Sequence, residues 1–174
     1  MKKIIVKEDS FAEIQIFSDF LNSKEFPQHR NIIFSSFPEL KEKISIQKKS
    51  EKLVIREFLK IVRKNNKENI QKSIDFIKNE VEEFGNEALG ILANLMDYKW
   101  KPKSTDYYLI PTLLPFCPFW GNTFFFSIYG SLKGKTEYPK VLAVAVHEIS
   151  HMLFFDILKD RNINLGNDLL YFIK

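Results

Sequence analysis

The stretch His147-Glu148-Ile149-Ser150-His151 constrains the fold of this chain more than any other part of it. On an α-helix, residues four apart differ by about 40° in azimuth, so the two imidazoles project from one face and can bind one ion. The Glu148 carboxylate is rotated off that face and can lie near the ion without displacing a ligand. In this HExxH pattern the carboxylate takes a proton from water that the metal activates. The spacing therefore requires a helix and predicts a metal site on it.

The residues around the motif predict one long helix from about residue 139 to residue 159. Pro139 stands at a favourable first helical position, and no Gly or Pro follows it within this stretch. Apolar residues lie on almost all sides of the predicted helix, which indicates a core helix rather than a half-exposed one. Two histidines and a glutamate in that setting need polar partners, and a bound cation would satisfy all three. The alternative is a structural helix whose histidines bind backbone carbonyls.

At this motif the sequence resembles the zincin metallopeptidases. Their extended signature asks for Val or Thr three residues before the first histidine, uncharged variable positions, and an apolar residue two after the second histidine. The residues that comply are Val144, Ala145, Ile149, Ser150, Met152 and Leu153. By this resemblance His147 and His151 would be ligands of a catalytic Zn²⁺, and Glu148 would be the catalytic base. The resemblance implies a zinc-dependent peptidase acting on a peptide or protein substrate.

The third zinc ligand is where the sequence departs from this family. A catalytic zinc normally has three protein ligands plus water, yet no Glu follows Glu148 in the chain. The metzincin continuation also fails, because Phe154 stands where that pattern needs Gly and Ile157 where it needs the third His. Asp156 and Asp160 fall on faces of the helix turned away from the histidines. A third ligand must therefore come from beyond this helix.

Asp168 is the candidate that remains. It opens the apolar run 169–173, and a second helix there could return and bring the carboxylate under the first. Gly166, Asp168 and Tyr171 look a little like the Gly, Asp and Tyr of the aspzincin subclass, with a shorter spacing from Gly to Asp. Two alternatives stay open. Asp168 complements a helix N-terminus instead, or the chain is interrupted within a helix and the ligand lies beyond Lys174.

Length and composition predict a single domain spanning residues 1–174. The hydrophobic content of 45%, which includes seventeen Phe, can fill one substantial core. The first residues carry two lysines and an apolar run too short for a signal peptide. The one cysteine, Cys117, excludes an internal disulfide, and its neighbours indicate a buried residue rather than a nucleophile. We therefore expect a cytoplasmic protein, and the sequence leaves its oligomeric state open.

Charge and hydropathy argue against two kinds of partner. Every run of about 18 mostly apolar residues contains charge, so we expect no ordinary transmembrane span. The net charge is +4 and the pI is near 9.0. Lys and Glu are nevertheless interspersed from Lys41 to Glu87, as on solvated helix faces, so we expect no nucleic-acid partner. His29 lies in a polar, Pro-flanked stretch and is expected at the surface.

The first hundred residues predict a mostly helical support for the site. A short strand is expected at residues 4–6. Apolar residues at three- and four-residue intervals predict amphipathic helices at residues 9–21, 51–62, 68–84 and 86–96. The breaks between these helices are expected at Gly85 and at residues 63–67.

Residues 105–174 predict strands followed by the metal-site helix. Aromatic and β-branched residues indicate two strands, at 107–110 and 123–129. If the second is a sheet edge, an extended peptide could add to it beside the metal; the alternative is a strand buried by its phenylalanines. The expected fold class is α+β, mostly helical and zincin-like, with a small sheet before the HExxH helix. Two other hypotheses remain: a catalytically inactive zincin-like metal-binding or interaction domain, and a structural domain without metal.

Overall fold

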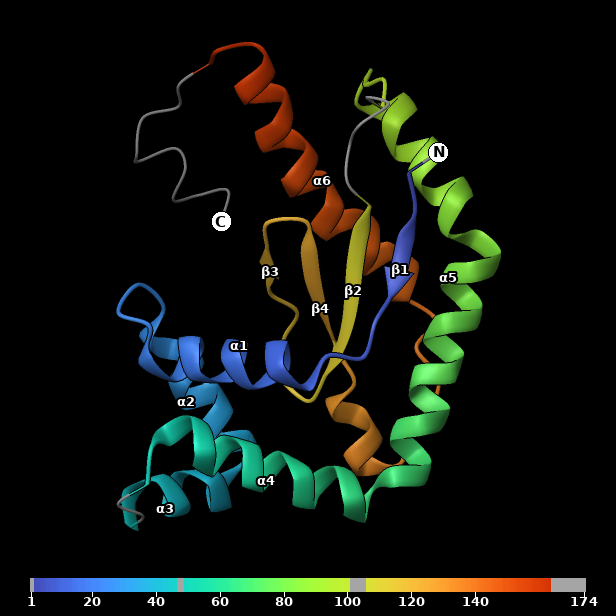
Figure 1. Cartoon of the computed structure of the whole chain (residues 1–174). Helices are drawn as coiled ribbons and strands as arrows, with labels where there is room; N and C mark the ends of the chain where they lie inside the picture. The colour runs from blue at the N-terminus through green and yellow to red at the C-terminus, as the bar shows by residue number, and fades with distance from the viewer. Residues whose placement is uncertain (1, 47–48, 101–105, 164–174) are drawn as a thin grey trace.

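The computed structural model describes residues 2–46, 49–100 and 106–163, and the candidate ligand Asp168 lies outside them. Within these ranges the chain is mostly helical with a small mixed sheet, which confirms the predicted α+β class (Figure 1). The helices are α1 (Ser10–Asn22), α2 (Pro27–Ser36), α3 (Pro38–Ile46), α4 (Glu51–Asn65), α5 (Lys67–Leu95) and α6 (Val141–Asp160), with a 3₁₀ turn, η1 (Tyr129–Lys133), before α6. The strands are β1 (Ile4–Val6), β2 (Tyr107–Thr112), β3 (Phe119–Trp120) and β4 (Thr123–Ser127).

The sheet has β4 in its interior and β3 at one edge. The strand order is β1-β2-β4-β3, in which β1, β2 and β4 run parallel and β3 pairs antiparallel with β4. The hypothesis that residues 123–129 form a sheet edge is therefore wrong, because β2 and β3 occupy both sides of β4. The alternative is confirmed, since Phe124, Phe125 and Phe126 are all buried.

Helices cover both faces of this sheet. α6 runs behind the sheet and packs against β4 and α5, whereas α1 crosses its front (Figure 1). Phe124 pairs with Phe119, whose ring contacts His151 of α6, so these two phenylalanines face α6. Because successive side chains of a strand point to opposite faces, Ile110 and Phe125 turn towards α1.

α5 continues unbroken through Gly85, so the predicted break there is wrong. A Cβ on this glycine would meet Val81 Cγ1 at 3.4 Å and Ile4 Cδ1 at 3.9 Å, which places Gly85 on the side of α5 that faces β1. A glycine inside a helix costs about 1 kcal/mol relative to alanine. Packing of a long amphipathic helix against the sheet outweighs that cost.

The remaining predictions for the first hundred residues hold with one omission. The strand at residues 4–6 is β1, and the helices expected to begin at residues 9 and 51 are α1 and α4. The break at 63–67 is also confirmed, since α4 ends and α5 begins within it. The sequence pattern gave no prediction for α2 and α3. Both begin at a proline, Pro27 and Pro38, which has a backbone angle suited to a first helical turn.

A buried ion pair joins α1 to α4 and to the end of β2. The Glu13 carboxylate, in a residue only 1% exposed, accepts from Arg63 Nη2 at 2.7 Å and from Nε at 2.9 Å. Its other oxygen accepts from the Leu113 N–H at 2.8 Å and from the Thr112 hydroxyl at 3.2 Å. A buried carboxylate is tolerated here because both of its oxygens are hydrogen-bonded.

Candidate functional site

The two histidines of the motif lie together on α6. Their Nε2 atoms are 3.2 Å apart, and their rings are perpendicular, with centroids separated by 4.7 Å. His147 is exposed and His151 is half-buried. The predicted helix is confirmed, although it begins at Val141 rather than at Pro139. The Val141 N–H donates to the Tyr138 carbonyl at 2.9 Å, which closes a turn at residues 139–140 before the helix starts.

The separation of the two nitrogens matches the geometry of a shared zinc ion. Zinc–imidazole bonds of about 2.0–2.1 Å at a tetrahedral angle put two ligand nitrogens about 3.3 Å apart. The observed Nε2–Nε2 distance of 3.2 Å differs little from that value. The same distance also suits a hydrogen bond between the rings, with one imidazole donating and the other accepting. The histidine pair therefore fits two of the ligand positions of a zinc site.

Glu148 is buried beside the histidines, as its rotation away from their face predicts. The residue is 8% exposed, and within the described ranges no hydrogen bond or ion pair reaches its carboxylate. Burial raises the pKa of Glu148, and the positive charge of His147 opposes that effect. The carboxylate also acts electrostatically on the Cys117 thiol, whose pKa its charge helps to raise.

Phe119 of strand β3 contacts His151, and no feature of the sequence predicted this contact. Its ring stacks on the His151 imidazole, with centroids 5.8 Å apart and planes only 5° from parallel. Burial lowers the pKa of His151, and His147 lowers it further. A signal for β3 was present, because Gly121-Asn122 is a two-residue hairpin loop between Phe119-Trp120 and Thr123-Phe124. The φ of 61° at Gly121 fits this turn.

α6 is buried along one stripe, so the expectation of a helix surrounded by core holds for one side only. The buried positions are Val141, Ala145, Glu148, Ile149, Met152 and Leu153. The exposed side includes Ala143 and His147, which gives a ligand or substrate access to the imidazoles. Among the described helices, α6 alone is long and apolar enough to cross a membrane, a test that core helices of soluble proteins also pass.

The described residues do not complete a set of three ligands. No group of three His, Cys, Asp or Glu side chains that could hold a metal occurs in residues 2–46, 49–100 and 106–163. Asp156 is exposed on α6. Burial lowers the pKa of Lys2, and the negative charge of Asp156 opposes that shift.

Cys117 and His29, the other residues that the sequence analysis considered for a functional role, have structural contacts instead. Cys117 is half-buried, so the prediction of a buried residue is confirmed only in part. Burial raises the pKa of its thiol, and its Sγ accepts from the Ser127 N–H at 3.3 Å. The prediction of a surface position for His29 holds only in part, because the residue is half-buried. Its ring packs against Phe116 and Phe20 at centroid distances of 4.5 and 5.0 Å, because α2 turns that side of the stretch inward.

In comparisons with known proteins, no family model matches the chain, and no curated protein or solved structure matches it either. The interpretation of the site therefore depends on its residues and geometry. Those are a pair of imidazoles at zinc-binding separation, a buried carboxylate next to them, and an aromatic residue of the edge strand stacked on one imidazole.

Proposed function

We propose that this chain is a zinc-dependent peptidase of the zincin type, acting in the cytoplasm on a peptide or protein substrate. His147 and His151 would hold the zinc, and Glu148 would be the general base. The observation that carries the proposal is the 3.2 Å separation of the two Nε2 atoms, which fits the geometry of two imidazoles on one zinc ion.

The residues of the site would divide the reaction between them. When bound, the zinc supplies Lewis acidity towards the scissile carbonyl and the attacking water. Glu148 accepts the proton of that water and later passes it to the leaving amine. Phe119 restricts the rotation of the His151 ring by stacking on it, which keeps Nε2 directed at the ion.

Strand β3 offers a place for the substrate backbone. It lies at the sheet edge, and its Phe119 reaches the histidine pair from there. An extended peptide that paired with β3 would add a strand to the sheet and pass beside the imidazoles. β4 cannot pair with a substrate peptide, because β2 and β3 already pair with both of its sides, so we assign peptide pairing to β3.

The third ligand separates the two leading functions. Asp168 remains our proposal for it and lies outside the described residues. The second candidate function is a zincin-like domain that binds metal or a partner without catalysis. It is favoured by the finding that the described part of the chain brings no three potential ligands together.

Zinc content and peptide hydrolysis, measured on the same protein, test the proposal. We expect about one zinc per chain by elemental analysis and cleavage of a quenched-fluorescence peptide library. Glu148→Gln should retain the zinc and lose hydrolysis by about a hundredfold or more, because the amide keeps the size of the side chain but cannot accept the proton. Glu137→Gln, the same change at an exposed position before α6, is the matched control and should behave as wild type.

Three outcomes can be distinguished. The peptidase is supported if His147→Ala loses the zinc and Glu148→Gln loses hydrolysis. Zinc that is bound through the histidines without any hydrolysis supports the inactive metal-binding domain. A zinc content that is unchanged in both His147→Ala and His151→Ala contradicts both, because the histidines are then not ligands.

A further inference from the structure

A second concave site lies on the sheet face opposite α6. A pocket of about 460 Å³ opens between α1 and the outer face of β2, β3 and β4. Its sheet wall includes Trp120, Thr123 and Tyr108, which the strand register places in one row across three strands. Trp120 follows Phe119, and Phe119 contacts His151. Since neighbouring side chains of a strand point to opposite faces, the pocket and the histidine pair lie on different faces of the sheet.

α1 forms the other wall of this pocket. Phe11, Gln15 and Asp19 line it at four-residue intervals, so they share one face of the helix. Phe11 is 72% exposed and Trp120 is 78% exposed. The pocket therefore has a large solvent-accessible aromatic ring on each wall, which is the arrangement found where proteins bind a ligand between rings.

Asp19 and Asn122 each provide an oxygen acceptor in the pocket. Gln15 donates to Asp19 Oδ1 at 2.7 Å, and within the described ranges the other oxygen of that carboxylate receives no hydrogen bond. One N–H of the Asn122 amide donates to the Asp106 carbonyl at 2.8 Å. In the part of the chain that the structure describes, the amide oxygen receives no hydrogen bond and is left as an acceptor. A ligand that brings donors or positive charge would match this set.

The charge of the residues that line the pocket also favours a cation. Among the charged residues that line the pocket, Lys7 and Asp9 form an ion pair at 2.8 Å, which leaves the charge of Asp19. Lys52 is not part of the lining, but its Nζ donates to Gln15 Oε1 at 2.7 Å.

We propose that the pocket binds an organic cation of the alkylammonium class, with its charged head between the aromatic walls and Asp19. The ring faces of Trp120 and Tyr108 attract such a head by cation–π interaction. An anion would meet the carboxylate, and a neutral apolar ligand would leave the acceptors unsatisfied.

The ligand chemistry could come from a free small amine or from the lysine side chain of a peptide, so the experiment uses both. Choline is compared with its neutral isostere 3,3-dimethylbutan-1-ol, and Nα-acetyl-lysine N-methylamide with the norleucine analogue. Binding is followed by the NMR signal of the Trp120 indole N–H, assigned by comparison with Trp120→Phe. We expect a saturable shift with at least one cation and an affinity about fivefold higher than for its neutral partner. The cation that binds more tightly identifies the source.

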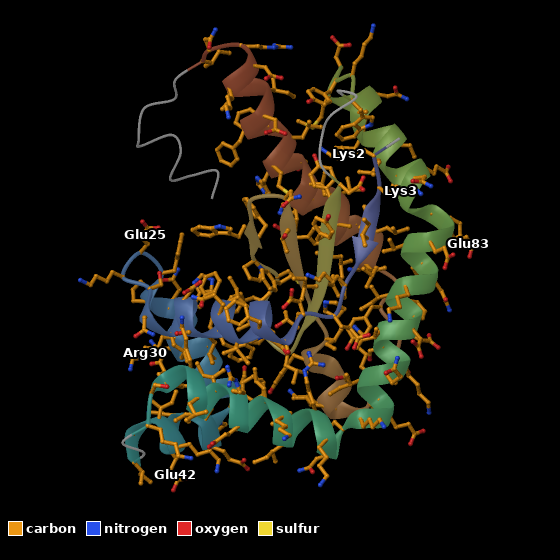
Figure 2. The ribbon with its side chains drawn as sticks, in the orientation of Figure 1. Lys2, Lys3, Glu25, Arg30, Glu42 and Glu83 are labelled. Carbon is orange, nitrogen blue, oxygen red and sulfur yellow. The ribbon has the colours of Figure 1, made fainter. Side chains whose placement is uncertain are left out.

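Variants test which residues carry the binding. Asp19→Asn should weaken cation binding about threefold to fivefold while leaving the neutral isostere unaffected. Glu83→Gln removes a carboxylate on the outer side of α5, directed away from the sheet, and should bind as wild type (Figure 2). Circular dichroism checks that each variant is folded, and binding should persist in His147→Ala because the pocket is separate from the histidine pair.

Two results would overturn this assignment. One is equal affinity for the cations and their neutral isosteres, which would show that charge has no role. The other is no saturable shift of the Trp120 signal with either cation up to tens of millimolar. Neither result bears on zinc binding or hydrolysis, so the pocket and the proposed peptidase can fail independently.

Discussion

The ring of Phe119 lies almost parallel to the imidazole of His151, with 5.8 Å between their centroids. This contact joins a two-residue edge strand to the second histidine of the motif. A histidine that is held by its neighbours binds metal with less loss of rotational freedom, and such supporting contacts typically change metal affinity by about 10–100-fold.

Phe119→Ala should therefore weaken zinc binding by about tenfold without removing a ligand. Phe119→Tyr retains the stacked ring and should bind zinc as tightly as wild type. Competition with a chromogenic chelator measures both affinities. An alanine variant with wild-type affinity would show that the stacking does not orient His151.

Arg63→Met should destabilise the fold by about 3 kcal/mol, because it leaves the buried Glu13 carboxylate without its charged partner. Glu13 is 1% exposed, whereas the Arg63 side chain is 28% exposed, so the carboxylate bears most of the cost. Urea unfolding followed by circular dichroism gives the free energy of unfolding. Adding Glu13→Gln to this variant should recover part of the loss. If the loss of stability in the double variant equals the sum of the losses in Arg63→Met and Glu13→Gln, the two residues are not coupled.

Two glycines should respond to alanine with opposite signs. Gly85→Ala is expected to stabilise the fold by about 0.5–1 kcal/mol, since the position is helical and the new methyl group meets only ordinary contacts, the nearest at 3.4 Å. Gly121→Ala is expected to destabilise it by about 1 kcal/mol, because φ is 61° there although the surrounding space is open. Thermal unfolding of both variants provides the comparison. A loss of stability in Gly85→Ala would mean that α5 cannot shift enough to accept a methyl group beside β1.

Cys117 should react slowly with Ellman's reagent in the folded protein. Burial raises the pKa of its thiol, so at pH 8 less of it is thiolate than in an ordinary exposed cysteine, and the side chain is also half-buried. The rate should continue to rise at pH values where a free cysteine is already ionised, and it should increase strongly in urea. A rate in buffer equal to that of free cysteine would contradict this description of the thiol.

The sequence predicted the elements whose signals are local. The four-residue spacing of the histidines and the long apolar stretch around them are sufficient to predict α6, and aromatic runs are sufficient to predict β2 and β4. At the candidate site the spacing also predicts that the two imidazoles share a face, and the Nε2–Nε2 distance of 3.2 Å agrees.

The features that the sequence missed depend on contacts between distant segments. Which strand lies at an edge is decided by pairing across the sheet, so residues 123–129 could not be placed without knowing that β3 folds back onto them. Gly85 was expected to end a helix on local propensity, and packing of α5 against β1 decides otherwise. The surroundings of His29 are likewise set by Phe116, which lies 87 positions later in the chain.

The pairing of β1 with β2 has a consequence for how the chain is made. Ile4 lies opposite Tyr107, so β1 leaves the ribosome about a hundred residues before the strand that pairs with it. Closing so long a loop carries a large entropic cost, and structures with many such distant pairings form slowly. Until Tyr107 emerges, the apolar residues of β1 and of the face of α5 beside it have no sheet to cover them. At that stage the nascent chain has exposed apolar surface, which is the condition under which partly folded chains aggregate.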